Sequence, residues 1–178
     1  GSYNVKMISH IIDDLFDKDF INHLYQLMIH EVPVTANNVA NSHRLFGTNI
    51  FARSGINRVD YLHNKAEKFF DAFDIIEDQF STPIYLKRID INLQFINMNG
   101  STHTDAVDDE LTVMLMNNSE WKPEWGGKTV FFYGKDKCVY NLPKPNTGVL
   151  FPAKMPHYAE STTRHFQGLR ITVAWKLS

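Results

Sequence analysis

Two stretches in the first eighty residues carry apolar side chains at helical spacing. The first begins after Asp17, which stands where an N-cap is expected, with Phe16 placed to pack back as a staple residue. Its apolar face consists of Phe20, Leu24, Leu27 and Met28. The pattern predicts a helix that ends near Val32-Pro33.

The second stretch predicts a helix from about Asp60. Its apolar face consists of Leu62, Ala66, Phe69, Phe70, Phe73 and Ile76. Between the two helices, residues 34–58 are rich in Asn, Ser, Gly and Arg without a clear period, which predicts a long irregular connection. Loops of this length often act as lids, so 37–58 is a candidate covering loop, with a simple surface connection as the alternative.

From Tyr85 the period changes to two. Tyr85, Ile89, Ile91, Leu93 and Phe95 alternate with Arg88, Asp90, Asn92 and Gln94. This alternation predicts a half-buried strand. Further strands are expected at 111–116, 129–133, 148–151 and 169–177, separated by turn residues.

Helices therefore come first and strands afterwards, with no internal repeat. We expect a mostly β protein whose N-terminal helices pack on an antiparallel double sheet, and closure as a jelly roll would remove exposed strand edges. The length of 178 residues suits a single domain, expected over 3–178, with helical support and the candidate lid at 3–82 and the jelly-roll core at 83–178.

Composition narrows the function classes. The net charge is -2 and no Lys/Arg block exceeds its acidic neighbours, which argues against nucleic acid or an anionic membrane as partner. Cys138 is the single cysteine, so a disulfide framework and a Cys-x-x-Cys metal site are excluded. The apolar runs are too short to span a bilayer, and the start lacks the pattern of a secretory signal. A cytoplasmic protein with a reduced thiol is expected.

Candidate metal ligands follow the alternating strand. Of the eight histidines, His103 alone is followed two residues later by an aspartate, Asp105. In extended backbone both side chains point to the same side and can converge on one point. The candidate third ligand is His157, which follows the apolar run 149–152 and precedes the terminal strand. Two imidazoles and one carboxylate leave coordination positions open, as non-haem iron(II) requires for reaction with dioxygen.

Five ordered segments resemble the prolyl-hydroxylase-like branch of the 2-oxoglutarate/iron(II) dioxygenases. They are His103-Thr104-Asp105, the strand 111–118, Trp125-Gly126-Gly127 with the strand to 132, Gly148 to Pro152 with His157, and the segment 168–175. The resemblance implies a double-stranded β-helix with N-terminal support helices. It also implies Fe(II), 2-oxoglutarate and O2 as cofactor and co-substrates, with ascorbate as a further candidate, and His103, Asp105 and His157 as catalytic metal ligands.

In that family a basic residue beyond the distal histidine anchors the remote carboxylate of 2-oxoglutarate, and this role falls on Arg170, with Thr172 on the same side of the strand. Arg164 also follows His157 but lies in a polar stretch expected to be an exposed loop. Many prolyl hydroxylases share the carboxylate with a tyrosine, and Leu115 stands at the aligned position here. Trp121 and Trp125 are candidates for lining the entrance, with structural packing as the alternative.

The function that this resemblance implies is hydroxylation of a C–H bond, with peptidyl proline as the first expected substrate and succinate and CO2 as co-products. A free amino acid or another small molecule is the alternative. Nucleic-acid demethylation ranks lower, because that branch has a second arginine where this chain offers Lys176. The non-enzymatic alternative is a jelly-roll binding module with incidental His and Asp residues.

Overall fold

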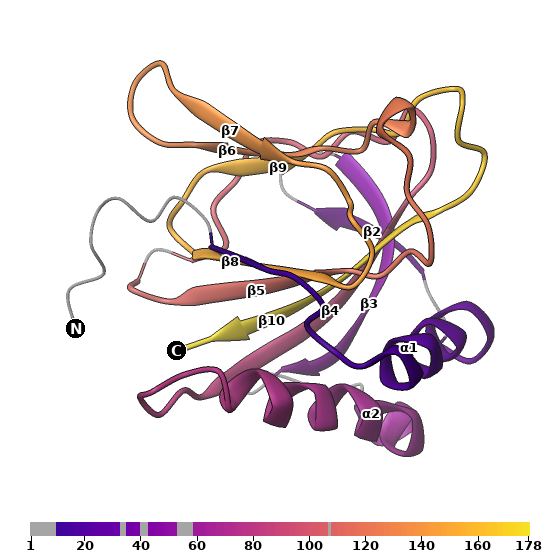
Figure 1. Ribbon diagram of the computed structural model, residues 1–178, viewed down its shortest axis with the longest axis vertical. Coiled ribbons are helices and arrows are strands. Elements are labelled where there is room, and N and C mark those ends of the chain that lie inside the picture. The colour runs from indigo at the N-terminus through magenta and orange to yellow at the C-terminus, as the bar shows by residue number, and fades with distance from the viewer. Residues whose placement is uncertain (1–9, 33–34, 40–42, 53–58, 107) are drawn as a thin grey trace.

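A computed structural model describes residues 10–32, 35–39, 43–52, 59–106 and 108–178, with backbone only for 35–39, 43–46 and 59–65. Within these residues the protein is built mainly of β-strands with two α-helices. Figure 1 shows three layers: a small sheet, a large sheet, and the two helices on the outer face of the large sheet. No described helix is both long and apolar enough to cross a membrane.

Helix α1 spans Lys18–His30 and begins as its local sequence predicts. The backbone N–H of Phe20 donates to the Asp17 carboxylate (2.8 Å), which satisfies one of the free donors at the helix start. The ring of Phe16 stacks on Phe20 with centroids 4.8 Å apart. Leu24, Leu27 and Met28 are buried, so the predicted apolar face is confirmed.

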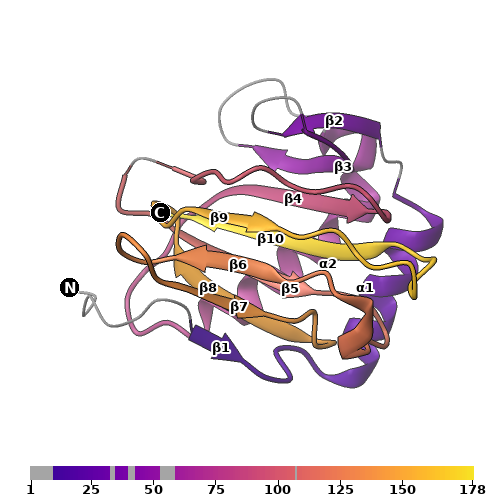
Figure 2. The same cartoon turned by 90° about the horizontal axis from the view of Figure 1, so that it is seen from above.

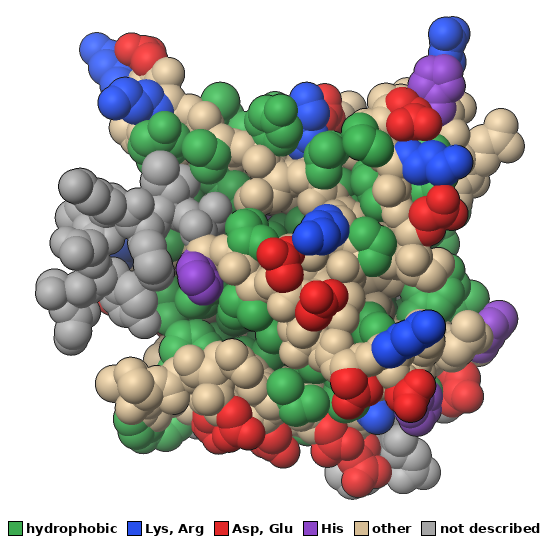
Figure 3. Space-filling model, in the orientation of Figure 1, with side chains coloured by type: hydrophobic (Ala, Val, Ile, Leu, Met, Phe, Trp, Pro, Cys, Tyr) green, Lys and Arg blue, Asp and Glu red, His purple; other side chains and the backbone are tan. Residues whose placement is uncertain are grey.

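Helix α2 spans Val59–Glu77 and buries Ala66, Phe69 and Ile76 completely. Its other face carries exposed acidic side chains, among them Glu67, Asp71 and Asp74. Figure 3 shows acidic side chains gathered along the lower edge of one face of the molecule, where α2 lies in Figure 1. The side chain of Leu62, also predicted to be apolar core, lies outside the described residues.

The large sheet has seven strands in the order β1-β8-β5-β10-β4-β3-β2. Their bounds are β1 His10–Ile12, β2 Thr35–Val39, β3 His43–Ala52, β4 Leu86–Gln94, β5 Leu111–Met116, β8 Thr147–Pro152 and β10 Arg170–Leu177. All neighbouring pairs are antiparallel. The strands predicted at 111–116, 148–151 and 169–177 are thus confirmed to within one residue at each end. The strand predicted from Tyr85 to Phe95 is confirmed as β4, although Tyr85 and Phe95 lie beyond its ends and are exposed.

The small sheet has three strands in the order β7-β6-β9. They are β6 Thr129–Phe132, β7 Cys138–Asn141 and β9 His157–Ala159, and a short 3-10 helix, Pro123–Trp125, precedes β6. Figure 2 shows this sheet lying over the large one. Two facing antiparallel sheets supported by helices are consistent with the expected jelly roll.

The prediction of an irregular connection over 34–58 is wrong for most of its length. Residues 35–39 and 43–52 form a hairpin, β2–β3, and β3 pairs with β4 along its edge. The hydrogen bonds donated and accepted by β4 make this polar stretch a strand, although its own sequence shows no period. The candidate lid therefore contains ordered sheet, and its remaining parts, 40–42 and 53–58, lie outside the described residues.

Side chains on the two faces of the large sheet have different surroundings. On the helix side, Ile91, Val173 and Trp175 pack in the main core, and the indole N–H of Trp175 donates to the Phe69 carbonyl of α2 (3.0 Å). On the opposite face a second apolar cluster lies between the two sheets and consists of Met116, Phe131, Val149 and Phe151. Every second residue of β10 therefore points toward the small sheet, and that face holds the candidate site.

Candidate metal centre

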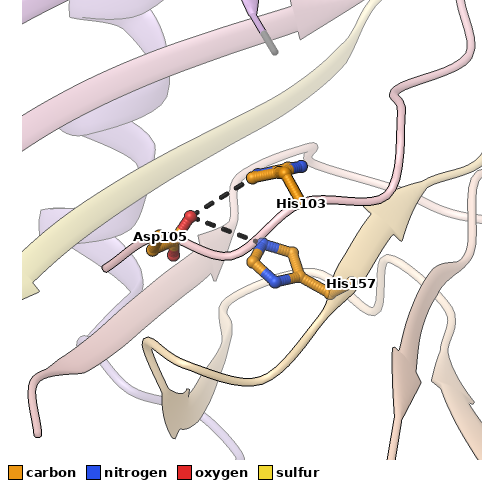
Figure 4. A group of neighbouring side chains, drawn as sticks. All are labelled: His103, Asp105 and His157. Atoms are coloured by element: carbon orange, nitrogen blue, oxygen red, sulfur yellow. Dashed lines mark ion pairs between the residues drawn. The ribbon is translucent and has the colours of Figure 1, made fainter. Parts of the chain in front are cut away.

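Three predicted ligands converge between the two sheets (Figure 4). His103 follows β4, and its backbone forms an antiparallel bridge with His157 at the start of β9, with both N–H···O distances at 2.9 Å. Asp105 lies two residues after His103, and its backbone N–H donates to the carbonyl of Ala153 (2.8 Å). The bridge brings together two histidines that are far apart in sequence, and Asp105 completes the group.

The potential ligand atoms face one another. Oδ1 of Asp105 lies 3.5 Å from Nε2 of His103 and 3.5 Å from Nε2 of His157, and all three ligand atoms lie within 4.8 Å of one another. Two imidazole nitrogens and a carboxylate oxygen are the ligand set of non-haem iron(II) oxygenases. The arrangement fits that metal.

Both imidazoles are held in the tautomer that metal binding requires. Nδ1 of His103 lies 2.8 Å from the carbonyl of Ser101, and Nδ1 of His157 lies 2.9 Å from the carbonyl of Met155. A carbonyl can only accept, so in each ring Nδ1 carries the hydrogen and Nε2 keeps its lone pair in the neutral form. Such second contacts fix the ring orientation of metal-binding histidines.

The other carboxylate oxygen of Asp105 is held by two residues of the large sheet. Oδ2 accepts from the Thr112 hydroxyl (2.6 Å) and from the ammonium of Lys176 (2.5 Å). Burial by itself raises the pKa of Asp105, but His103 and Lys176 outweigh it and hold the pKa well below its ordinary value. Asp105 is therefore an anion with one oxygen anchored and the other directed at the two imidazoles.

The two imidazoles differ in their surroundings. The hydrogen bond with Asp105 raises the pKa of His103, partly offset by burial. Burial lowers the pKa of His157, which is the more enclosed of the two, and this outweighs its attraction to Asp105. His157 therefore favours the neutral form that binds metal.

Arg170 is deeply buried, with 2% of its surface exposed. Nε donates to the Gly127 carbonyl (2.9 Å), one terminal nitrogen to Gln94 (2.9 Å) and the other to the Thr129 hydroxyl (2.7 Å). These contacts use three of its five N–H groups. Burial lowers the pKa of Arg170 to about 10, so it stays protonated at neutral pH.

No described carboxylate forms an ion pair with Arg170. A buried cation without an anion is costly, and an anionic ligand would compensate it. The buried Arg170 guanidinium therefore fits a carboxylate such as the remote end of 2-oxoglutarate. Thr172 is also buried and lies on the same side of β10, as predicted.

Four other residues singled out from the sequence, Arg164, Leu115, Trp121 and Trp125, lie outside the ligand group. Arg164 is exposed, in agreement with the predicted loop. Leu115 lies in the core on the helix side of the large sheet, so a tyrosine at this position could not reach Arg170. The alignment of Leu115 with the tyrosine of prolyl hydroxylases is therefore wrong. Trp121 and Trp125 pack edge to face with centroids 5.5 Å apart, and both contact Phe166, which supports the packing alternative.

Sequence reasoning missed the residues that support the site. Thr112 and Lys176 hold Asp105, whereas Gln94, Thr129 and the Gly127 carbonyl hold Arg170. One signal was present for Lys176: it is in phase with Arg170 and Thr172 on an otherwise apolar strand. A lysine at an inward position of such a strand indicates a buried anionic partner.

Comparison of the sequence with protein families and with curated proteins finds no match. Comparison of the structure with solved structures finds similar folds. A 2OG-Fe(II) oxygenase family oxidoreductase from Burkholderia pseudomallei superposes with a TM-score of 0.74 at 16% identity, covering 97% of this chain and 86% of that one. A prolyl hydroxylase from Trichoplax adhaerens, solved with a hypoxia inducible factor peptide fragment, gives 0.63 at 14% identity, over 94% and 82% of the two chains.

The epimerase SnoN, solved with Fe3+, alpha ketoglutarate and nogalamycin RO, also superposes with a TM-score of 0.63. Its identity is 11%, and the match covers 95% of this chain and 78% of that one. The chain therefore has the fold of the 2OG-Fe(II) oxygenases. Because these neighbours include both a prolyl hydroxylase and an epimerase, the fold leaves the substrate open.

Proposed function

We propose that the protein is a 2-oxoglutarate- and iron(II)-dependent dioxygenase that hydroxylates a C–H bond of an organic substrate. The observation that carries this proposal is the joint presence, in one inter-sheet space, of the ligand group His103, Asp105 and His157 and of the buried cation Arg170, which no described carboxylate pairs. A jelly-roll binding module would have no need of both.

In this proposal His103, Asp105 and His157 hold iron(II), and Arg170 with Thr172 binds the remote carboxylate of 2-oxoglutarate. When bound, iron and 2-oxoglutarate activate O2 so that one oxygen atom enters succinate and the other the substrate, with release of CO2. The chain orients these groups: the Nδ1 contacts present each Nε2, and Lys176 with Thr112 turns Oδ1 of Asp105 toward the metal position.

Two substrate classes follow. Peptidyl proline is the class favoured by the sequence resemblance, and a neighbour of this fold was solved with a peptide. A free amino acid or another small molecule is the second class, favoured by the polar cavity beside Asp105. Nucleic acid remains the least favoured substrate: the net charge is -2, and Lys and Arg are scattered on the face drawn in Figure 3.

The test is calorimetric titration of the chelator-treated protein under anaerobic conditions. Mn(II), a redox-stable substitute for Fe(II), should bind with a stoichiometry near one, and 2-oxoglutarate should bind more tightly once the metal is present. In air with Fe(II), the protein should convert 2-oxoglutarate to succinate slowly without added substrate. Failure to bind either group would refute the proposal.

A further inference from the structure

A polar cavity of about 460 Å3 lies beside Asp105 on the inter-sheet face of the large sheet. The described residues that line it come from β3, β4, the segment before β5, and the end of β10. Asp105 and Lys176 belong both to this cavity and to the metal centre described above. The cavity therefore meets the metal centre at the Asp105 carboxylate, whereas neither imidazole of the ligand group lines it.

The cavity is separate from the site of the co-substrate. Arg170 and Lys176 point to the same side of β10 but stand six residues apart, about 20 Å along an extended strand. The metal centre lies between these two side chains. On one side, Arg170 contacts Thr129 of β6, and two residues further along β6 Phe131 pairs with His157. On the other side, Lys176 contacts Asp105. A 2-oxoglutarate held by Arg170 at one end and by the metal at the other would occupy the Arg170 side of the metal centre, which leaves the cavity for a second molecule.

The wall of the cavity is charged. Ala52 is the one apolar side chain among its described lining residues, and none is aromatic. A proline ring buried there would lack apolar contacts and would displace water from charged groups, which costs free energy. The wall instead suits a small ligand that carries charges of its own.

Arg88 is held in a defined orientation at this wall. Asp90 accepts from Nε of Arg88 (2.6 Å) and, through its other oxygen, from the side-chain amide of Asn49 (2.9 Å). The Arg88 side chain is 53% exposed and that of Asp90 17%, so an anchored carboxylate orients a guanidinium that solvent and ligands can reach. A guanidinium fork is the group best suited to bind a carboxylate in two-point fashion.

A β-bulge adds a second cation. Lys176 pairs with Arg88, but Leu177 pairs with Leu86, so Lys87 is an extra residue in β4 and lines the cavity together with Arg88. Bulges are common beside active sites because they redirect a side chain. Lys87 forms an ion pair with Glu110, whose carboxylate faces the same cavity.

From this wall we infer that the substrate is a small zwitterion with a free carboxylate, in the simplest case a free amino acid, bound by its carboxylate on Arg88 and Lys87 and by its ammonium near Glu110. The inference rests on the proposed function and narrows it to the second substrate class. The cavity is large enough for such a molecule and falls within the usual range for small-ligand sites.

The test compares the twenty free L-amino acids with their N-acetyl and C-amide derivatives and with a proline-containing hexapeptide. Succinate release and a mass gain of one oxygen are measured with Fe(II), and binding is measured by calorimetry with Mn(II) and 2-oxoglutarate in place. We expect at least one free amino acid to bind and react and its C-amide to lose most of the effect. Reaction with the hexapeptide or with the C-amides, but with no free amino acid, would overturn the inference and leave the proposed function standing.

A variant pair locates the binding site. Arg88→Gln should raise the KM for the reactive amino acid by at least tenfold, whereas the matched control Arg164→Gln, on an exposed loop, should leave it within twofold. The Kd for 2-oxoglutarate, which depends on Arg170 at the other end of β10, serves as an internal reference for folding. An unchanged KM in Arg88→Gln would overturn the assignment of this cavity. Absence of metal and 2-oxoglutarate binding in the wild type would instead refute the proposed function and the inference with it.

Discussion

The ammonium nitrogen of Lys176 lies 2.5 Å from Oδ2 of Asp105, and both side chains are largely buried, with 16% and 5% exposed. In a metal-free protein this lysine is the cation closest to the carboxylate in the described part of the chain. Once a metal is bound at Oδ1, Asp105 has two positive partners. Lys176 thus holds the carboxylate in place before the metal arrives.

Lys176→Met should lower the free energy of unfolding of the metal-free protein by about 2–4 kcal/mol, because it leaves a buried carboxylate without its cation. Mn(II) should reduce the difference in the free energy of unfolding between the variant and wild type, since a bound metal would supply positive charge to Asp105. Lys144→Met is the matched control: its ion pair with Asp13 is exposed, with 67% and 59% of the side chains accessible, and should contribute less than about 1 kcal/mol. Equal losses in urea unfolding of the two variants would contradict the role of Lys176.

The effect of Lys176→Met should depend on pH with a definite sign. In the folded protein the pKa of Asp105 lies below the ordinary value of 3.8. The ionised carboxylate therefore stabilises the fold above pH 3.8, and this stabilisation is lost as the pH falls toward the folded-state pKa. In the metal-free protein, the difference in the free energy of unfolding between wild type and Lys176→Met should therefore be largest at neutral pH and should decrease in acid. Unfolding curves at a series of pH values measure it.

His103→Ala, Asp105→Ala and His157→Ala should each abolish stoichiometric metal binding, because two remaining ligands hold iron(II) poorly. Succinate formation should fall at least a hundredfold in each. His165→Ala is the control, since His165 is exposed, and it should keep both properties. Metal content by atomic spectroscopy and circular dichroism of each variant separate loss of metal from loss of fold; one triad variant with full metal and full turnover would show that the ligand set is misassigned.

Arg170→Ala should raise the Kd for 2-oxoglutarate about ten- to a hundredfold, or ~1.4–2.8 kcal/mol, because it removes the buried cation that faces the carboxylate. Arg170→Lys keeps the charge but loses the fork held by Gln94 and Thr129, so its loss should be intermediate. Arg164→Ala should change the Kd little. The opposite ranking in calorimetric titrations would move the anchor to Arg164.

Gly127→Ala should impair both stability and co-substrate binding. Gly127 has φ +72°, and a Cβ there would lie 2.9 Å from Trp121 and 3.2 Å from Cδ of Arg170. Gly134 also has positive φ, +86°, but nothing lies within 4 Å of its Cβ position, so Gly134→Ala isolates the backbone strain, about 1–2 kcal/mol. We expect Gly127→Ala to lower the free energy of unfolding by more than Gly134→Ala does, and also to raise the Kd for 2-oxoglutarate. Urea unfolding and calorimetry measure the two effects. Equal losses of stability and an unchanged Kd would show that the contact with Arg170 is unimportant.

The sequence by itself determined the features whose forces are local. The Asp17 cap and the apolar face of α1 depend on contacts three and four residues apart, and the alternation in β4 depends on a period of two. The same period places His103 and Asp105 on one side and Arg170 in phase with Thr172. These positions follow from the spacing of residues along the chain alone.

Tertiary structure decided what depends on distant partners. The polar residues 43–52 form strand β3 because β4 offers them hydrogen bonds, and residues 35–39 form β2 because β3 pairs with them. The short strands β7 and β9 exist because β6 lies between them. Lys176 reaches Asp105 only once β10 lies between β4 and β5, and Gly127 meets Arg170 only once the two sheets face each other. Sheet hydrogen bonds and buried ion pairs join residues far apart in the chain, so their partners are set by the packing of whole layers and leave no local period to read.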